Sequence, residues 1–463
     1  MESEFPNLVS GIPEADVGLF TDLYELTMAA GYFREGMAAP ATFSLFIRDY
    51  PPRRGFFIAA GLADALVYLQ RLAFPPSAIA YLRSTGIFPE DFLDSLATVR
   101  FTGEVWAVPE GRAVFANEPL LEVTAPIIEA QLAETFLMNI VNFQTLIATK
   151  AARCVLAAQG KTLVDFGLRR THGTDAGMKA ARCSYLAGFA STSNVLAGKV
   201  YGIPIAGTMA HSYITSFPSE LEAFRAWVRT FPDRSILLID TYETLAAARK
   251  AVAVAQEMTR QGKRLVGVRL DSGDLVALSR DVRRILDEAG LTGVRIFASG
   301  GLDEDEIARL LDAGAPIDAF GVGTRLGVAA DAPLLDSAYK QVAYGDRPVL
   351  KLSEKKATLA GPKQVFREYA PDGTLLRDTL ARRGQDGPPG AEALLVPVMA
   401  QGRPLGPGPT LAELRQTCAA ELARLPAAVR DLARPSRYEV RVSPALETLQ
   451  ARTAAAVRQR ELG

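Results

Sequence analysis

The sequence contains few histidine, cysteine and tryptophan residues. Its 463 residues include two histidines, three cysteines and two tryptophans. The cysteines, Cys154, Cys183 and Cys418, lie far apart, so they form neither a metal-ligand pair nor a disulfide framework. We therefore expect a protein of a reducing compartment.

The chain also lacks an excess of charge of one sign. Its 51 Lys and Arg residues and 52 Asp and Glu residues give a formal net charge of −1. Without a basic run interleaved with aromatic residues, nucleic acid is not an expected partner, and small molecules are favoured. Residues 1–11 are acidic where a signal peptide would be basic, and Asp64 interrupts the apolar stretch 56–69. We expect a cytoplasmic protein with no membrane partner.

Strand-like and helical segments alternate through the middle of the chain. Helical spacing of apolar residues predicts helices over 242–261 and 274–289, and a third helix opens at Asp303 and closes at Gly314. Because the strands are short and polar residues follow their C-terminal ends, we predict a closed or nearly closed β/α barrel. The six strand-like runs are 163–166, the run that starts at Tyr201 and breaks at Gly207, 236–239, 265–270, 294–298 and 317–322.

The flanking parts of the chain lack this rhythm. Residues 1–138 and 346–463 mix helical and β-like pieces, and helices are expected at 411–425 and 445–458. With 49% hydrophobic residues, the chain can bury two cores. We therefore predict an α/β fold with an irregular β/α barrel over 139–345 and a second α+β domain built from the two flanking segments.

Glycine-rich turns follow the last two predicted strands. Ser299, Gly300 and Gly301 form one turn, and the segment 321–324 forms the other, ending in Gly323 and Thr324. Backbone N–H groups without obstructing side chains, together with hydroxyls, suit a phosphate at this face of a barrel. Two tight strand-to-helix turns are the alternative, and the sequence leaves both open.

Carboxylates and guanidinium groups end two other strands. Asp271, with Arg269 one strand position inside, suits Mg²⁺ and a polyol such as ribose, whereas Asp274 can also cap the next helix. The aromatic ring of Phe166 and the arginine pair at 169–170 that follows it suit a flat anionic ligand or a phosphate. A surface arginine pair is the alternative reading of those two residues.

His211 follows a small-residue turn, and Asp240 ends the next strand. A barrel would make them neighbours, with the carboxylate fixing one imidazole tautomer. Such a histidine can act as a base or a nucleophile. A hydrogen-bonded structural histidine is the alternative, but the phosphate-friendly turns on the same rim favour a functional role.

Seven motifs, in order, make the chain resemble the nicotinate phosphoribosyltransferases, type II phosphoribosyltransferases of NAD biosynthesis, over nearly its whole length. The motifs are TDLYELTM at 21–28, DFGLRR at 165–170, SYLAGFASTSNVLAG at 184–198, GTMAHSY at 207–213, VRLDSGDL at 268–275, FASGGLDE at 297–304 and FGVGTRLG at 320–327.

This resemblance implies condensation of nicotinate with phosphoribosyl pyrophosphate, giving nicotinate mononucleotide and pyrophosphate, coupled to hydrolysis of ATP. It implies that ATP phosphorylates His211, which Asp240 orients. It also implies that Phe166 and Tyr24 of a neighbouring subunit sandwich the pyridine ring, so that a homodimer shares its active sites.

The remaining roles follow from the same resemblance. Arg169 and Arg269 would meet the nicotinate carboxylate or the pyrophosphate, and Asp271 the ribose hydroxyls and Mg²⁺. The residues assigned to the 5′-phosphate are Ser299, Gly300, Gly323 and Thr324.

One residue bears on the choice between acid and amide. In the related nicotinamide phosphoribosyltransferase, an aspartate accepts from the substrate amide at the position that aligns with Ser193. A serine hydroxyl can donate to a carboxylate, whereas an aspartate would repel it, so we expect nicotinate as substrate.

Three rivals stay open: a nicotinamide phosphoribosyltransferase, an ATP-free quinolinate-type enzyme, and a non-catalytic ligand-binding paralogue. His211 with Asp240 argues against the ATP-free enzyme. For His172 we favour a loop position over a phosphate contact. The C-terminal lysines could neutralise nucleotide phosphates or form a solvated charge run; they are Lys351, Lys355, Lys356 and Lys363.

Overall fold

The computed structural model describes residues 12–353 and 358–462. The predicted absence of a signal peptide at 1–11 and the positions of Lys355 and Lys356 lie outside the described residues. The chain forms two compact units, Met1–Thr149 with Ala332–Gly463, and Lys150–Asp331. Among the described helices, none is both long and apolar enough to cross a membrane.

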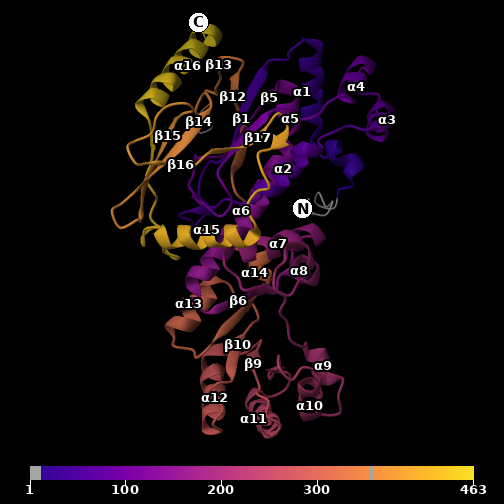
Figure 1. Cartoon of the computed structure of the whole chain (residues 1–463), viewed down its shortest axis with the longest axis vertical. Helices are drawn as coiled ribbons and strands as arrows, with labels where there is room; N and C mark the ends of the chain where they lie inside the picture. Colours follow the sequence, from indigo (N-terminus) through magenta and orange to yellow (C-terminus); the bar gives the residue numbers. More distant parts are fainter. Residues whose placement is uncertain (1–11, 354–357, 463) are drawn as a thin grey trace. The chain divides into compact units, whose positions relative to one another are not determined.

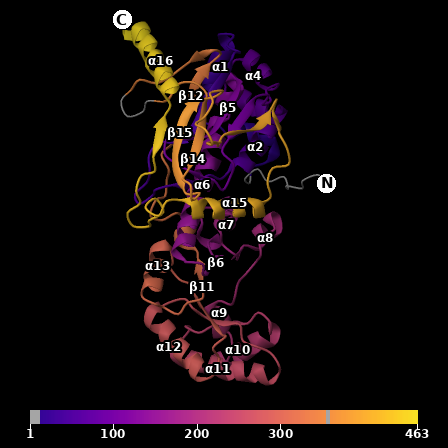
Figure 2. The same ribbon diagram turned by 60° about the vertical axis from the view of Figure 1, so that its left-hand side comes forward.

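Two sheets form the centre of the first unit, and Figures 1 and 2 label most of their strands. In the larger sheet every neighbouring pair is antiparallel. In the smaller sheet β19 (Val440–Val442) runs parallel to β15 (Leu375–Arg382). The larger sheet has the order β13 (Arg347–Pro348), β12 (Ser337–Tyr344), β1 (Pro40–Ile47), β5 (Pro119–Pro126), β3 (Glu104–Ala107), β17 (Val396–Ala400) and β18 (Arg403–Pro404). The smaller has the order β16 (Glu392–Ala393), β14 (Lys363–Tyr369), β15 (Leu375–Arg382) and β19 (Val440–Val442). A short pair joins β2 (Phe57–Ile58) to β4 (Ala113–Val114).

Strand β1 carries much of the core of this unit, because seven of its eight residues are buried. Burial on both faces requires cover on both sides of the sheet. The helices of the unit are η1 (Glu14–Leu19), α1 (Leu23–Arg34), α2 (Leu62–Arg71), α3 (Pro76–Ser84), α4 (Glu90–Leu96), α5 (Ile127–Leu132), α15 (Leu411–Arg424) and α16 (Pro444–Leu462). Helix α6 (Glu134–Ala157) contains the division between the units.

A buried arginine joins the smaller sheet to helix α15. Arg367 is fully buried and donates to both carboxylate oxygens of Asp378 on the neighbouring strand and, over 2.7 Å, to Glu421 of α15. Two carboxylates around one guanidinium satisfy its fixed fork of donors.

The second unit is built on a parallel sheet that curls as half of a barrel. Helices α11 (Thr244–Arg260), α12 (Leu275–Glu288) and α13 (Glu304–Asp312) lie along it in Figures 1 and 2. Its strand order is β7 (Ser191–Thr192), β6 (Thr162–Asp165), β11 (Ala319–Val322), β10 (Arg295–Ala298), β9 (Gly267–Leu270) and β8 (Ile236–Leu238). Its helices are η2 (Leu168–Arg170), α7 (Thr174–Ala187), α8 (Val195–Tyr201), α9 (His211–Thr215), α10 (Glu220–Thr230), α11 (Thr244–Arg260), α12 (Leu275–Glu288), α13 (Glu304–Asp312) and α14 (Thr324–Gly327).

The α/β prediction is confirmed, with one strand wrong. The run from Tyr201 is not a strand: it contributes a single parallel bridge, between Ile205 and Thr192, because Pro204 has no N–H to extend the ladder. The sixth strand is instead β7, two polar residues that no hydrophobic run could signal. Among the described residues no pairing joins β8 to the Ile205 segment, so the barrel stays open there.

The boundaries between the units differ from the sequence estimate of 138/139 and 345/346. The compact units divide at 149/150 and 331/332. Strand β12 pairs with β1 from Ala41 to Ile47 and therefore belongs to the sheet of the first unit.

An ion cluster with three fully buried members anchors helix α13 in the second unit. Glu304, at the start of α13, lies 2.5 Å from Lys150 Nζ and 2.8 Å from Arg153 Nε, and all three side chains are at most 1% exposed. Asp331 completes the cluster, 2.6 Å from Lys150. Buried charges are tolerated only when paired in this way.

We expect Glu304→Gln to destabilise the protein by about 3 kcal/mol, because it leaves buried cations without their shared carboxylate. Urea unfolding followed by circular dichroism measures the change. Glu306→Gln is the matched control on the same helix. Its carboxylate is 31% exposed and pairs with Arg309, so the loss there should stay below about 1 kcal/mol. Equal losses in the two variants would contradict the buried-cluster argument.

Candidate active site

Most predicted site residues of the second unit follow the C-terminal ends of its strands, whereas Arg269 lies within β9 and His211 opens helix α9. Because β6, β8, β9, β10 and β11 are parallel, these ends share one edge of the sheet. Ligands of open and barrel-like α/β proteins bind at this edge.

Asp271 follows β9 and bonds residues at the ends of both neighbouring strands. Its carboxylate accepts from the Ser299 hydroxyl and lies 3.4 Å from Arg269 Nη2. Its backbone N–H donates to Asp240 Oδ2 over 3.0 Å, and the Ser272 hydroxyl donates to the same oxygen over 2.6 Å. The ends of β8, β9 and β10 are therefore bonded to one another through one residue.

The glycines of the two turns are required by close approach of backbone and side chains. Gly300 has φ +91°, and a Cβ there would lie 1.9 Å from the carbonyl oxygen of Asp271. At Gly323 a Cβ would lie 2.7 Å from the carbonyl oxygen of Phe166. The tight-turn reading therefore holds for both sites, and the turns leave backbone groups uncovered by side chains.

The cationic guanidinium of Arg269 and the aromatic ring of Phe166 lie next to each other at this edge. The Arg269 guanidinium carbon lies 5.9 Å from the centre of the Phe166 ring, which packs at a tilt against Phe297. Arg269 donates to the Thr208 hydroxyl and the Met209 carbonyl, while its buried Nε has no partner. Burial lowers the pKa of Arg269, and Asp271 opposes that shift.

His211 is the first residue of helix α9, and its ring lies near two residues. Nδ1 lies 3.1 Å from the Thr241 hydroxyl, and Nε2 lies 3.9 Å from Asp271 Oδ2. The expected contact with Asp240 is not made, because that carboxylate turns toward the next strand and binds Asp271 and Ser272. Thr241 was missed, although it directly follows the predicted Asp240.

The DFGLRR segment forms a turn fixed by a buried carboxylate. Asp165 accepts from the Gly167 N–H over 2.8 Å and from the Thr192 hydroxyl over 2.7 Å, and burial raises its pKa. Arg169 follows on the exposed 3-10 turn η2. Its neighbour Arg170 donates to the Thr324 hydroxyl over 3.1 Å, so the arginine pair and the second glycine turn lie together.

Ser193 lies beside this turn, half-buried, with its N–H donating to the Asp165 carbonyl over 2.8 Å. Tyr24 lies in the first unit, on α1, with its side chain 45% exposed. Burial and the nearby Glu134 raise the pKa of its phenol.

Four other predicted residues have structural or surface positions. Asp274 caps α12, accepting from the N–H groups of residues 276 and 277. His172 is exposed in the connection between η2 and α7. Lys363 is buried and lies 3.1 Å from Glu122, so it is no part of a solvated charge run, whereas Lys351 is exposed.

The carboxylates at the strand edge suit Mg²⁺. Asp240 Oδ1 is buried without a hydrogen-bond partner, and its other oxygen binds the amide of Asp271. Among the described residues no three acidic, histidine or cysteine side chains form a cluster for a metal ion. Mg²⁺ is commonly held by one or two carboxylates together with substrate phosphates, which this pair of aspartates fits.

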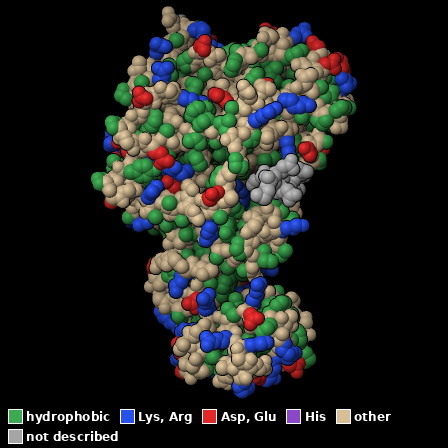
Figure 3. All heavy atoms as spheres, viewed as in Figure 1, with side chains coloured by type: hydrophobic (Ala, Val, Ile, Leu, Met, Phe, Trp, Pro, Cys, Tyr) green, Lys and Arg blue, Asp and Glu red, His purple; other side chains and the backbone are tan. Residues whose placement is uncertain are grey.

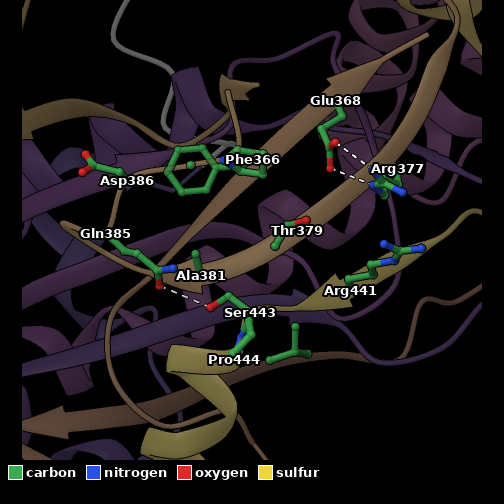
Figure 4. A pocket seen from close by; sticks show the side chains of 13 residues that line it. Phe366, Glu368, Arg377, Thr379, Ala381, Gln385, Asp386, Arg441, Ser443 and Pro444 are labelled. Carbon is green, nitrogen blue, oxygen red and sulfur yellow. Dashed lines mark hydrogen bonds and ion pairs between the residues drawn. The ribbon is translucent and has the colours of Figure 1, made fainter. Parts of the chain in front are cut away.

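A separate pocket of about 400 Å³ lies in the first unit, between the smaller sheet and the start of α16 (Figure 4). Its arginines are paired: Arg377 with Glu368 over 2.8 Å, and Arg441 with Glu439 over 2.6 Å. None of the predicted site residues lines this pocket. Basic and acidic side chains are likewise interspersed on the face of the molecule in Figure 3.

Comparison with known proteins identifies the family. Residues 19–142 match the nicotinate phosphoribosyltransferase (NAPRTase) N-terminal domain, residues 161–344 the NAPRTase family, and residues 387–450 the nicotinate phosphoribosyltransferase C-terminal domain.

Individual relatives are similar to this chain over most of their length. Nicotinate phosphoribosyltransferase pncB2 of Mycobacterium tuberculosis is 50% identical over 417 residues, 89% of each chain. Nicotinate phosphoribosyltransferase of Bacillus subtilis is 43% identical over 367 residues, 77% of this chain and 74% of the relative. The crystal structure of human nicotinic acid phosphoribosyltransferase superposes with a TM-score of 0.85 at 33% identity, covering 93% of this chain and 99% of that one. The resemblance predicted from the seven motifs is confirmed, and the chain belongs to the nicotinate phosphoribosyltransferase family.

Proposed function

We propose that this protein is an ATP-dependent nicotinate phosphoribosyltransferase that salvages nicotinate for NAD biosynthesis. The observation that carries the proposal is the match of all three family domains along the chain, together with the linked polar residues at the strand edge of the second unit.

In the proposed reaction the pyridine nitrogen of nicotinate attacks C1′ of phosphoribosyl pyrophosphate. The new bond is C1′–N, the bond that breaks is C1′–O, and pyrophosphate leaves with that electron pair. Positioning and electrostatic stabilisation of the leaving group carry most of such a reaction. Mg²⁺, held by Asp271 and Asp240, would supply charge neutralisation of the pyrophosphate oxygens.

Nicotinate would bind with its ring against Phe166 and its carboxylate near Arg269 and Ser193. The guanidinium over the Phe166 ring brings a cation and an aromatic face to the same place, as a flat anion requires. Arg169 would meet the pyrophosphate, and the turns with Gly300 and Gly323 the 5′-phosphate, with Ser299 and Thr324 supplying hydroxyls. Exposed Tyr24 would complete the ring sandwich from a second subunit of a homodimer.

ATP would act through His211. An imidazole nitrogen attacks the γ-phosphorus, the bond to ADP breaks, and water later releases the group as inorganic phosphate. The ring is 44% exposed and lies 3.9 Å from Asp271, so it is accessible from solvent and adjacent to the sugar-phosphate site.

The test is mononucleotide formation from phosphoribosyl pyrophosphate and Mg²⁺ with nicotinate, nicotinamide or quinolinate, each with and without ATP. We expect product from nicotinate, increased by ATP. Product from nicotinamide or quinolinate alone would replace the proposed substrate, and no product from any of them would favour a binding paralogue.

We expect His211→Ala to lower ATP hydrolysis at least about 10³-fold and to remove the stimulation by ATP, because no nucleophile remains to accept the phosphoryl group. His172→Ala is the matched control, since it removes the other histidine of the chain, which is exposed, and should leave both unchanged. Coupled ATP hydrolysis that survives in His211→Ala would overturn the phosphohistidine.

Substrate choice is tested at Ser193. We expect Ser193→Asp to raise KM for nicotinate about 10- to 100-fold, because a carboxylate would face the carboxylate of the substrate. Ser193→Asn introduces a side chain of the same size as aspartate but without its charge, so it should change KM much less. Unchanged kinetics in Ser193→Asp would remove Ser193 from the substrate site.

A further inference from the structure

The imidazole of His211 is held on one side only. Its Nδ1 lies 3.1 Å from the Thr241 hydroxyl, within hydrogen-bond distance, whereas its Nε2 is 3.9 Å from the nearest Asp271 oxygen, beyond it. One ring nitrogen is therefore occupied by the protein, and the other is left for a ligand.

We propose that Thr241 is a positioning residue that holds the His211 ring through Nδ1, so that Nε2 is the nitrogen that takes the phosphoryl group. The inference rests on the proposed phosphorylation of His211 and specifies its regiochemistry. It also replaces Asp240 in the orienting role that the sequence assigned to it.

The surroundings of the histidine support this role. His211 lies on the short helix α9, outside the sheet, and α9 is anchored to α10 by the ring contact of Tyr213 with Trp227, 5.3 Å apart. Among the described residues, the bond to Thr241 is the side-chain hydrogen bond that fixes the imidazole to the end of β8. Asp240 binds Asp271 and Ser272 through Oδ2, and its Oδ1 makes no hydrogen bond to the ring in this structure.

A hydroxyl suits both stages of the transfer. Before it, Thr241 accepts from Nδ1–H, which leaves the Nε2 electron pair free to attack phosphorus. The N–P bond forms, the P–O bond to ADP breaks with its electrons on ADP, and the Nδ1 proton passes to solvent. After it, the same hydroxyl donates to the bare Nδ1. A carboxylate could accept in the first stage but could not donate in the second.

The first experiment identifies the phosphohistidine isomer. The enzyme is phosphorylated with ATP, digested under alkaline conditions, and the isomers are separated by chromatography. We expect the Nε2 isomer in the wild type and in Thr241→Ser, and an about 10-fold slower phosphorylation with a mixture of isomers in the isosteric Thr241→Val. An Nδ1 isomer in the wild type, or a Thr241→Val variant with wild-type rate and isomer, would overturn the proposal. Absence of phosphohistidine from the wild type would overturn the proposed phosphoenzyme itself, which makes the two failures distinguishable.

The second experiment needs no catalysis and uses the scarcity of histidine. In a His172→Ala background, His211 is the single histidine, so two ring-nitrogen resonances report on it in a ¹⁵N-histidine-labelled protein. We expect Thr241→Val to shift the Nδ1 resonance and Thr241→Ser to restore it, with the same far-ultraviolet circular dichroism in all three proteins. An unshifted Nδ1 resonance in Thr241→Val would show that the hydroxyl does not hold the ring and would overturn the inference.

Discussion

The candidate site depends on the way in which the ends of β8, β9 and β10 hold one another at Asp271. The Asp271 amide is bonded to Asp240, its carboxylate to Ser299, and its carbonyl oxygen lies where only glycine fits at position 300. These contacts fix three strand ends relative to each other at hydrogen-bond precision. The positions of the polar groups that follow these strands depend on that arrangement. Catalytic groups must be held this precisely.

The same edge contains polar atoms that the protein does not satisfy. Asp240 Oδ1 and Arg269 Nε are buried without hydrogen-bond partners, and such atoms cost stability. By contrast, the deeper charges of this unit, Glu304 with Lys150 and Arg153, are fully paired. Two such atoms at the strand edge fit a surface whose remaining partners are ligands.

Hydrophobic runs predicted five of the six strands of the second unit, because a buried strand must be apolar. They could not predict β7, whose two residues are Ser191 and Thr192, since its pairing depends on neighbours distant in sequence. Among site residues, strand-end position found Asp271, whereas His211 follows a run that is not a strand and bonds Thr241 instead of the expected Asp240. Whether Asp240 or Thr241 turns toward the ring depends on side-chain directions after β8, which spacing alone does not encode.

The order of the strands along the chain also determines which of the two units can finish folding first during synthesis. Strand β1 pairs with β12, about 300 residues later, and β17 and β18 follow later still, so the larger sheet stays incomplete until residue 404 has left the ribosome. All the strands of the second unit, from β6 to β11, are made before that point. Domains commonly fold in N- to C-terminal order. Here, however, the second unit can finish folding while β1 is still unpaired on the side that later binds β12. During that interval the edge of an apolar strand is exposed, and chaperones could bind it.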